Sequence, residues 1–400
     1  MKHKLYQSHS LIAIVYFLVA ALLGVLLRSY PTFSFNLNYR FVVHAHSHIA
    51  LLGWAYVALT TLLHYCFTDK DTASISYKRV FWCTQGTLIG MLFTFPFQGY
   101  ALFSIIFSTL FLIMSYVFFH HFLKSIDPQY RHSRSLLCIK AALWYMVISS
   151  VGPWALGAIM NSVGAQSIWY RLAIYFYLHF QYNGWMILAL TGLFLFALEQ
   201  NGMVVPQKKF KYFFWLLNIG VVLTFFLSVL WTQPSTLIYM IAGIGAVVQL
   251  YAFVLLGTIS KNGVVRLSLS KMQYLLLGTV VMLGLAKMAL QLLISLPYFA
   301  NMATIYLDLT IGYLHMTFLG VISIGRFFLM SLFGLLRLTG KAYLGYFSGF
   351  LITEFLIFYK GLAAWQEVRI FEGHAKLLAM ASLLIPIGIL AMYLHNRVPK

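Results

Sequence analysis

The stretch HAHSHIALLGW, residues 44–54, places His44, His46 and His48 inside a run of apolar residues long enough to cross a membrane. Ionisable side chains are costly at membrane depth, and those that occur there are mostly functional. In an α-helix, residues four apart lie on one face, whereas residues two apart lie on nearly opposite faces. We therefore expect His44 and His48 on one side of this helix and His46 on the other.

The composition of the whole chain is that of an integral membrane protein. Of 400 residues, 62% are hydrophobic and only 9% are charged, and the mean hydropathy is +0.85. A helix needs about 20 apolar residues to cross the hydrocarbon of a bilayer. Twelve such runs predict an all-α membrane protein with a single transmembrane domain over residues 1–400. The runs are 10–28, 40–66, 80–99, 101–122, 136–160, 168–198, 211–231, 236–258, 272–296, 303–334, 343–362 and 375–395.

The net charge of +19 is explained by membrane topology and not by nucleic-acid binding. Lys and Arg gather at both chain ends and in alternate loops between the expected helices. Cytoplasmic loops of membrane proteins carry such an excess of basic residues. We expect a multi-pass protein of the inner (cytoplasmic) membrane, embedded in the lipid bilayer, with both termini in the cytoplasm. The basic loops are 67–79, 123–135, 199–211, 259–271 and 335–342.

A short motif occurs three times, as HIALLGW (48–54), HFQYNGW (179–185) and HMTFLGV (315–321). Each copy has a histidine followed five residues later by a glycine, and the copies lie 131 and 136 residues apart. Each interval contains four of the expected helices, so His48, His179 and His315 occupy equivalent depths. Internal periods of this kind indicate repeated structural units. The sequence predicts three four-helix pseudo-repeats, approximately 1–134, 135–270 and 271–400.

Histidines at one membrane depth point to a bound metal or haem. Neutral imidazole is a good ligand for iron and copper, and a pair of histidines on facing helices can hold a haem. The chain has no Cys-x-x-Cys-His, so a non-covalent haem b is expected, with copper as a further candidate. For each histidine taken singly, a hydrogen-bonded packing role is the alternative. The candidate cofactor ligands are His44, His46, His48, His179 and His315, and four of these, His46, His48, His179 and His315, are also candidate metal ligands.

The remaining histidines are expected at helix ends or in loops, as interfacial residues without a ligand role. They are His3, His9, His64, His120, His121, His132, His374 and His395.

Twelve helices in three four-helix units, with histidines on the second, sixth and tenth, resemble the subunit I superfamily of haem-copper oxidases. The resemblance implies a cytochrome c oxidase subunit I-like fold. It also implies that His315 and one histidine of the second helix hold a low-spin haem, and that His179 is a copper ligand. The seventh run has no histidine, and the tenth has only His315 where the superfamily uses His-x-His. A complete centre of copper and high-spin haem is therefore not expected.

The function expected from this resemblance is that of a membrane haem protein that handles electrons or a gas such as O2 or NO. The protein could have an oxidoreductase activity of the oxidase type. Its substrate could be a quinol or a small gas, and it could have partner redox subunits. The opening stretch also resembles the early His-x-His segment of the NnrS family of haem proteins, with His46 and His48 in that pair. A secondary transporter that uses the histidines for proton coupling, without haem, is the other alternative.

Few acidic or basic residues lie inside the expected spans. Lys287 and Glu354 fall at about the depth of the histidines, and a lone charge there costs at least about 2.5–3.5 kcal/mol. We therefore expect these two side chains to pair. Arg326 is expected either to point into the helix bundle or to reach for the membrane surface.

Overall fold

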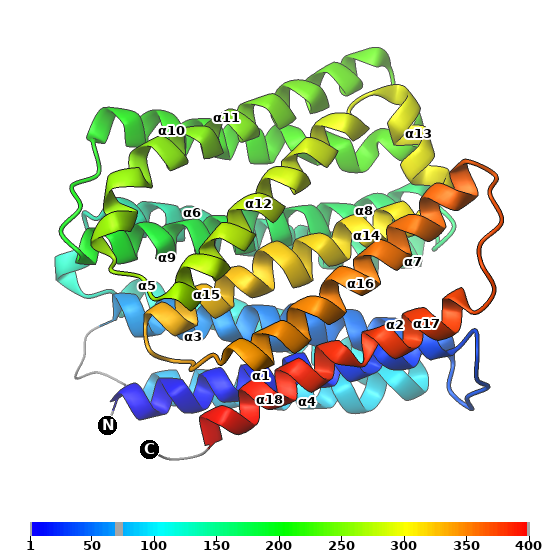
Figure 1. The fold of residues 1–400 in the computed structure, drawn as a ribbon, viewed down its shortest axis with the longest axis horizontal. Coiled ribbons are helices and arrows are strands. Elements are labelled where there is room, and N and C mark those ends of the chain that lie inside the picture. Colours follow the sequence, from blue (N-terminus) through cyan, green and yellow to red (C-terminus); the bar gives the residue numbers. More distant parts are fainter. Residues whose placement is uncertain (1, 69–74, 398–400) are drawn as a thin grey trace. The chain divides into compact units, whose positions relative to one another are not determined.

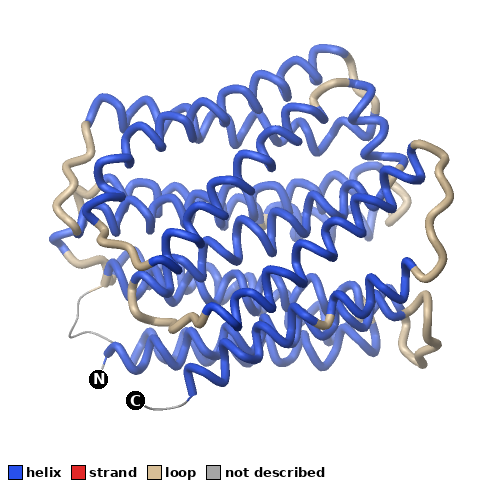
Figure 2. Tube along the Cα trace, in the orientation of Figure 1, coloured by secondary structure: helices blue, strands red, loops and turns tan. Residues whose placement is uncertain are grey.

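The computed structural model describes residues 2–68 and 75–397, and nearly all of these residues are helical (Figure 2). Strands are absent from the described residues, in which Thr68 and Ile126 form an isolated antiparallel bridge. The described residues include twelve helices that are long and apolar enough to cross a membrane. This number confirms the expected twelve spans and the expectation of a multi-pass membrane protein.

Several spans consist of two or three consecutive helical segments joined without a loop. The twelve spans are α1 (Lys2–Ser29); α2, η1 and α3 (Tyr39–His48, Ile49–Tyr56, Val57–Phe67); α4 (Ile75–Gln98); α5 (Leu102–Lys124); α6 and α7 (Arg134–Ser149, Val151–Ser162); α8, η3 and α9 (Ile168–His179, Phe180–Met186, Ile187–Gln200); α10 and η4 (Gln207–Leu223, Thr224–Thr232); α11 (Thr236–Arg266); α12 (Lys271–Ile294); α14, η5 and α15 (Leu307–His315, Met316–Ser323, Ile324–Leu332); α16 (Gly340–Trp365); and α17 and α18 (His374–Ser382, Leu384–Arg397). Two short helices lie outside the spans, η2 (Pro128–Tyr130) and α13 (Pro297–Ile305).

Polar residues at the helix starts fix the ends of several spans. The Asn38 side chain accepts hydrogen bonds from the first amides of α2. Ser270 and Gln273 form a reciprocal capping box at the start of α12. Such caps satisfy backbone N–H groups that have no partner inside the helix. The tenth span begins at Leu307 and not at 303, because α13 starts at Pro297 and ends as a separate helix.

The chain divides into two compact units. Unit 1 contains residues 1–128 and 326–400, and unit 2 contains residues 129–325. The first division lies close to the expected repeat boundary at 134. The two units otherwise do not coincide with the three expected four-helix repeats. The tenth span begins in unit 2 and continues into unit 1 at Arg326.

In unit 1, α1 packs against the second span and against α17 and α18, while α4 packs against α5. The start of α1 and the end of α18 lie at the same end of this unit (Figure 1). Helices α16 and α18 approach closely at Gly388, where a Cβ atom would lie only 2.4 Å from the Tyr346 nitrogen. Small residues commonly allow such close contacts between membrane helices.

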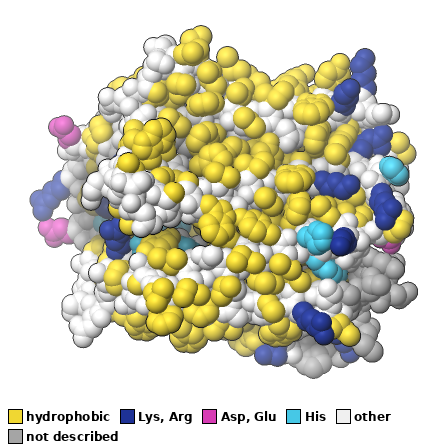
Figure 3. Space-filling model, turned by 180° about the vertical axis from the view of Figure 1, so that it is seen from behind, with side chains coloured by type: hydrophobic (Ala, Val, Ile, Leu, Met, Phe, Trp, Pro, Cys, Tyr) yellow, Lys and Arg dark blue, Asp and Glu magenta, His cyan; other side chains and the backbone are white. Residues whose placement is uncertain are grey.

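In unit 2, α6 packs against η3 and α9, α10 packs against α11, and α12 packs against η5. The pair α10 and α11 meets at Gly245, where a Cβ atom would lie 2.6 Å from the Leu223 Cβ atom. The protein surface seen in Figure 3 is largely hydrophobic, with Lys and Arg gathered toward its edges. This distribution suits helices whose outer sides contact lipid.

Candidate ligand histidines

All three copies of the repeated motif have the same unusual backbone. His48, His179 and His315 are each the last residue of an α-helix, and a π-helix begins directly after each of them. The π-helices are η1, η3 and η5, of 8, 7 and 8 residues. A π-helix is rare, and it often occurs at a functional site inside an α-helix. The motif therefore corresponds to a specific local structure as well as to a repeated sequence.

The motif glycines let neighbouring helices approach. A Cβ atom at Gly53 would lie 2.9 Å from the Tyr16 ring on α1, and one at Gly184 would lie 2.6 Å from the Tyr145 ring on α6. In both copies, then, the tyrosine of the preceding span occupies the space that a larger residue would need. Helix packing is thus the role that the structure gives to these two glycines.

His46 faces α1 in unit 1. Its Nδ1 atom lies 2.9 Å from the Ala20 carbonyl oxygen, and its ring is in contact distance of Gly24, where a Cβ atom would lie 3.2 Å from the imidazole Cε1 atom. Because a carbonyl oxygen can only accept, the Nδ1 atom must carry the proton. The Nε2 atom of this half-buried ring is then the nitrogen with the lone pair.

His44 and His48 lie on the other side of α2, as the helix geometry predicted. His44 contacts the Tyr100 ring, with centroids 4.7 Å apart, and His48 stacks on Phe95 at 4.2 Å. The His48 Nδ1 atom donates to the His44 carbonyl oxygen at 2.8 Å. Its Nε2 atom lies 3.4 Å from the Tyr100 hydroxyl. His48 therefore has the same tautomer as His46.

His315 in unit 2 repeats the geometry of His48. Its Nδ1 atom donates to the carbonyl oxygen of Ile311, four residues earlier, at 2.9 Å. The ring is half-buried, and its lone pair is again on Nε2. His48 and His315 thus use the same bond to the carbonyl one turn back.

His179 differs, because its ring is fully buried in unit 2 and its Nε2 atom, not its Nδ1 atom, bonds to a backbone carbonyl. The Nε2 atom donates to the Val221 carbonyl oxygen at 2.8 Å, and the Nδ1 atom accepts from the Asn183 amide at 3.2 Å. The ring is 1% exposed. A metal at either nitrogen would have to replace one of these bonds, so the arrangement does not favour a copper ligand here.

The polar network continues from Asn183 to a buried lysine. The Lys287 ammonium group donates to the Asn183 Oδ1 atom at 2.8 Å and to the Gln291 Oε1 atom at 2.6 Å. It also lies about 6 Å from the centres of the Tyr182 and Tyr313 rings, at 5.8 and 6.0 Å. Amide dipoles and aromatic faces therefore stabilise the lysine.

Lys287 lies in unit 2 and Glu354 in unit 1, so their expected pairing stays a prediction. The hydrogen bonds of Lys287 go to two amide oxygens, and neither carboxylate oxygen of Glu354 has a hydrogen-bond partner among the described residues. Depth along a helix, from which the pairing was predicted, does not specify the side of the helix on which a residue lies. Gln291 is four residues from Lys287 on one helix and is therefore a ready partner.

Arg326 points into the protein interior and not toward the surface. Its side chain is 0% exposed, and its guanidinium lies 5.3 Å from the centre of the Trp54 ring in unit 1. The Nε and Nη2 atoms of Arg326 have no hydrogen-bond partner among the described residues. Of the two expected positions for Arg326, the helix bundle interior and the membrane surface, the structure therefore shows the interior.

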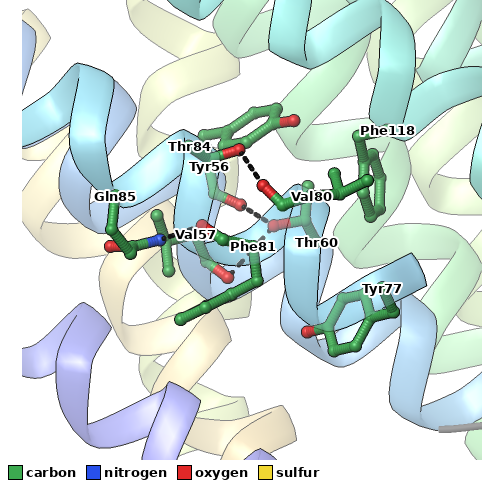
Figure 4. A pocket seen from close by; sticks show the side chains of 9 residues that line it. All are labelled: Tyr56, Val57, Thr60, Tyr77, Val80, Phe81, Thr84, Gln85 and Phe118. Carbon is green, nitrogen blue, oxygen red and sulfur yellow. Dashed lines mark hydrogen bonds between the residues drawn. The ribbon is translucent and has the colours of Figure 1, made fainter. Parts of the chain in front are cut away.

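A small cavity in unit 1 lies between η1, α3, α4 and α5 (Figure 4). Its volume of about 10 Å³ gives room for roughly one water molecule. The Tyr56 hydroxyl and the Gln85 Oε1 atom beside it have no hydrogen-bond partner among the described residues. The cavity has room for a water molecule near these two groups and is too small for a cofactor.

Three histidines expected at the interface are in fact buried. His9, His64 and His374 are 2%, 0% and 6% exposed. His374 bonds to the Leu356 carbonyl oxygen, which is a packing role. Their places near helix ends gave no sign of burial, because helix position alone does not show whether neighbouring helices cover that end.

The described residues contain no group of three or more His, Cys, Asp or Glu side chains that could hold one metal ion. A haem needs only one or two axial ligands, so a haem does not depend on such a group. No protein-family model and no curated protein matches this sequence. The resemblance to the oxidases therefore stays a prediction.

Proposed function

We propose that this chain is a membrane haem protein of the haem-copper oxidase subunit I type, which handles electrons or a gas such as O2 or NO. The proposed haem is haem b, and its one or two axial ligands are drawn from His46, His48 and His315. The observation that supports this proposal is the common state of these rings, in which Nδ1–H is held by a backbone carbonyl. Metal-bound histidines commonly have this bond, which orients the ring and leaves Nε2 as the ligand atom.

Iron in such a haem would supply one-electron redox chemistry, and the chain's own residues would hold and orient it. Each carbonyl bond fixes the ring plane of its histidine and raises the basicity of Nε2. The three rings are half-buried. His44 has no hydrogen bond of this kind among those found, and it packs against Tyr100, so we propose it as a neighbour of the ligand and not as a ligand.

The proposal includes three four-helix repeats, because the same α-to-π transition follows each motif histidine. It does not include copper at His179, whose two ring nitrogens are already bonded. We also propose the cytoplasmic membrane with both chain ends on its cytoplasmic side, in agreement with the basic loops. Quinol or a partner redox subunit would then be the electron donor.

An absorbance difference spectrum of the purified protein, reduced minus oxidised, tests the proposal. Expression with ample haem should give a protein with the sharp α band of a low-spin b-type haem. The variants H46A, H48A and H315A test each ligand separately, and loss of the band identifies a ligand that is needed. His132 lies exposed in a loop, so H132A is the matched control and should keep the full spectrum.

A colourless protein that is folded and helical would overturn the haem proposal. It would favour the second candidate, a secondary transporter. The observation that supports a transporter is the buried network of His179, Asn183 and Lys287, because ionisable groups buried at membrane depth often serve proton coupling. Proton uptake by proteoliposomes that K287M abolishes would then support that candidate.

A further inference from the structure

Two histidines outside the motif face each other in unit 1. His64 is in the last turn of α3, and His121 is in the last turn of α5. Their Nε2 atoms are 3.4 Å apart, and their ring planes differ by only 4°. His64 is fully buried and His121 is half-buried. Each ring thus directs the same nitrogen toward the other.

The distance between the two Nε2 atoms is long for a hydrogen bond. Hydrogen bonds from N–H groups span about 2.7–3.2 Å between heavy atoms. Two Zn–N bonds of about 2.0–2.1 Å at a tetrahedral angle would place their nitrogens about 3.3–3.4 Å apart. The observed 3.4 Å therefore fits two nitrogens that share a metal ion better than two that share a proton.

The outer nitrogens of both rings contact hydroxyl groups. The His64 Nδ1 atom lies 2.7 Å from the Tyr6 hydroxyl and 3.0 Å from the Thr68 hydroxyl. The Thr68 hydroxyl donates its one proton to the His64 carbonyl oxygen, so toward Nδ1 it must accept. With its proton on Nδ1, donated to one of these hydroxyls, His64 directs its Nε2 lone pair at His121. The His121 Nδ1 atom lies 3.4 Å from the Ser76 hydroxyl.

Backbone contacts hold the two helix ends together. Thr68 and Ile126, just beyond α3 and α5, form the isolated antiparallel bridge, and the Asp127 amide donates to the Phe67 carbonyl oxygen at 3.0 Å. The Tyr77 ring covers His64, with centroids 3.8 Å apart. The two imidazoles are thus positioned by rigid neighbours, which is what a preformed ligand pair requires.

We propose that His64 and His121 form a binding site for a late first-row transition-metal ion of the Zn²⁺ class, held through both Nε2 atoms. Neutral imidazole suits such ions, whereas Mg²⁺ and Ca²⁺ prefer oxygen ligands. The protein supplies two ligands, and water or a small molecule completes the coordination. Half-buried His121 gives the ion its access. The site is independent of the proposed haem, because it uses different histidines.

Zn²⁺ binding to the full chain tests this site. The protein is purified in detergent, stripped of metal with a chelator, and titrated with Zn²⁺ by calorimetry. The wild type should bind one equivalent of Zn²⁺ per chain more than H121A does. His120 is the exposed neighbour of His121 on the same helix, so H120A is the matched control and should keep that equivalent. Titration with Co²⁺ should give visible absorption bands of a bound ion in the wild type and in H120A. H121A should lack these bands.

The variant Y6F removes an outer hydroxyl and keeps both ligands. Loss of such a partner typically weakens metal affinity about 10–100-fold, and we expect a decrease in this range. A circular dichroism spectrum and a thermal stability of metal-free H121A equal to those of the metal-free wild type would show that the variant is folded. Equal Zn²⁺ stoichiometry and affinity in the wild type, H121A and Y6F would overturn the site, and a hydrogen bond between the two rings would then be the better explanation.

Discussion

The bond between Lys287 and Asn183 can be tested by a double-mutant cycle with N183L, K287M and the double variant. Both side chains are buried, at 2% and 1% exposure, and the bond is 2.8 Å long. A hydrogen bond to a charged group contributes about 1.5–3 kcal/mol net. Each single variant leaves buried polar groups without partners, so we expect each to lower the free energy of unfolding by about 2–4 kcal/mol.

The double variant removes both partners together. Its loss of unfolding free energy should therefore be less than the sum of the losses of the two single variants. We expect a coupling energy of about 1.5–3 kcal/mol, because replacing both partners by apolar groups is nearly neutral. Unfolding in mixed detergent and SDS, followed by circular dichroism, measures the four free energies. Lys208 is exposed, so K208M with N183L is the control cycle and should be additive. Additivity of K287M and N183L within about 0.5 kcal/mol would refute the network.

Three further variants test packing, capping and burial by thermal unfolding in detergent. G184A should lose about 1–3 kcal/mol by overpacking, because its Cβ atom would lie 2.6 Å from Tyr145; G157A, with nothing within 4 Å, is the control and should lose no stability. E199A should lose about 1.5–3 kcal/mol, because the carboxylate accepts bonds from the first two amides of α6, and E199Q should recover part of this loss. R326M should leave stability unchanged or raised, because it removes a buried guanidinium whose Nε and Nη2 atoms have no hydrogen-bond partner among the described residues; a loss above about 3 kcal/mol would mean that this guanidinium is paired.

The number of spans and most of their limits could be predicted from the sequence. Hydrophobic length alone indicates a membrane helix, since the bilayer thickness sets how many apolar residues are needed. Helix periodicity also predicted that His46 and His48 lie on opposite sides of α2. The rotation per residue in an α-helix is fixed, so two residues two positions apart face nearly opposite directions.

The partners of polar groups could not be predicted from the sequence. Lys287 bonds Asn183, which is 104 residues away along the chain. Such a contact depends on how the helices are rotated about their axes, and hydropathy does not fix that rotation. The facing pair of His64 and His121 was missed for the same reason, since each lies near the end of its span and only the packing of α3 and α5 brings them together.

The residue four positions after each motif histidine accounts for the different states of the rings. In the first and third motifs this residue is leucine, which offers no hydrogen bond, and the histidine Nδ1–H donates to the carbonyl one turn back. In the second motif it is Asn183, whose amide donates to the His179 Nδ1 atom, so the ring proton must be on Nε2 and the Val221 carbonyl accepts it. One amide in place of an isobutyl group thus reverses the tautomer. Three copies of one motif can therefore share a backbone and still differ in which ring nitrogen carries the proton.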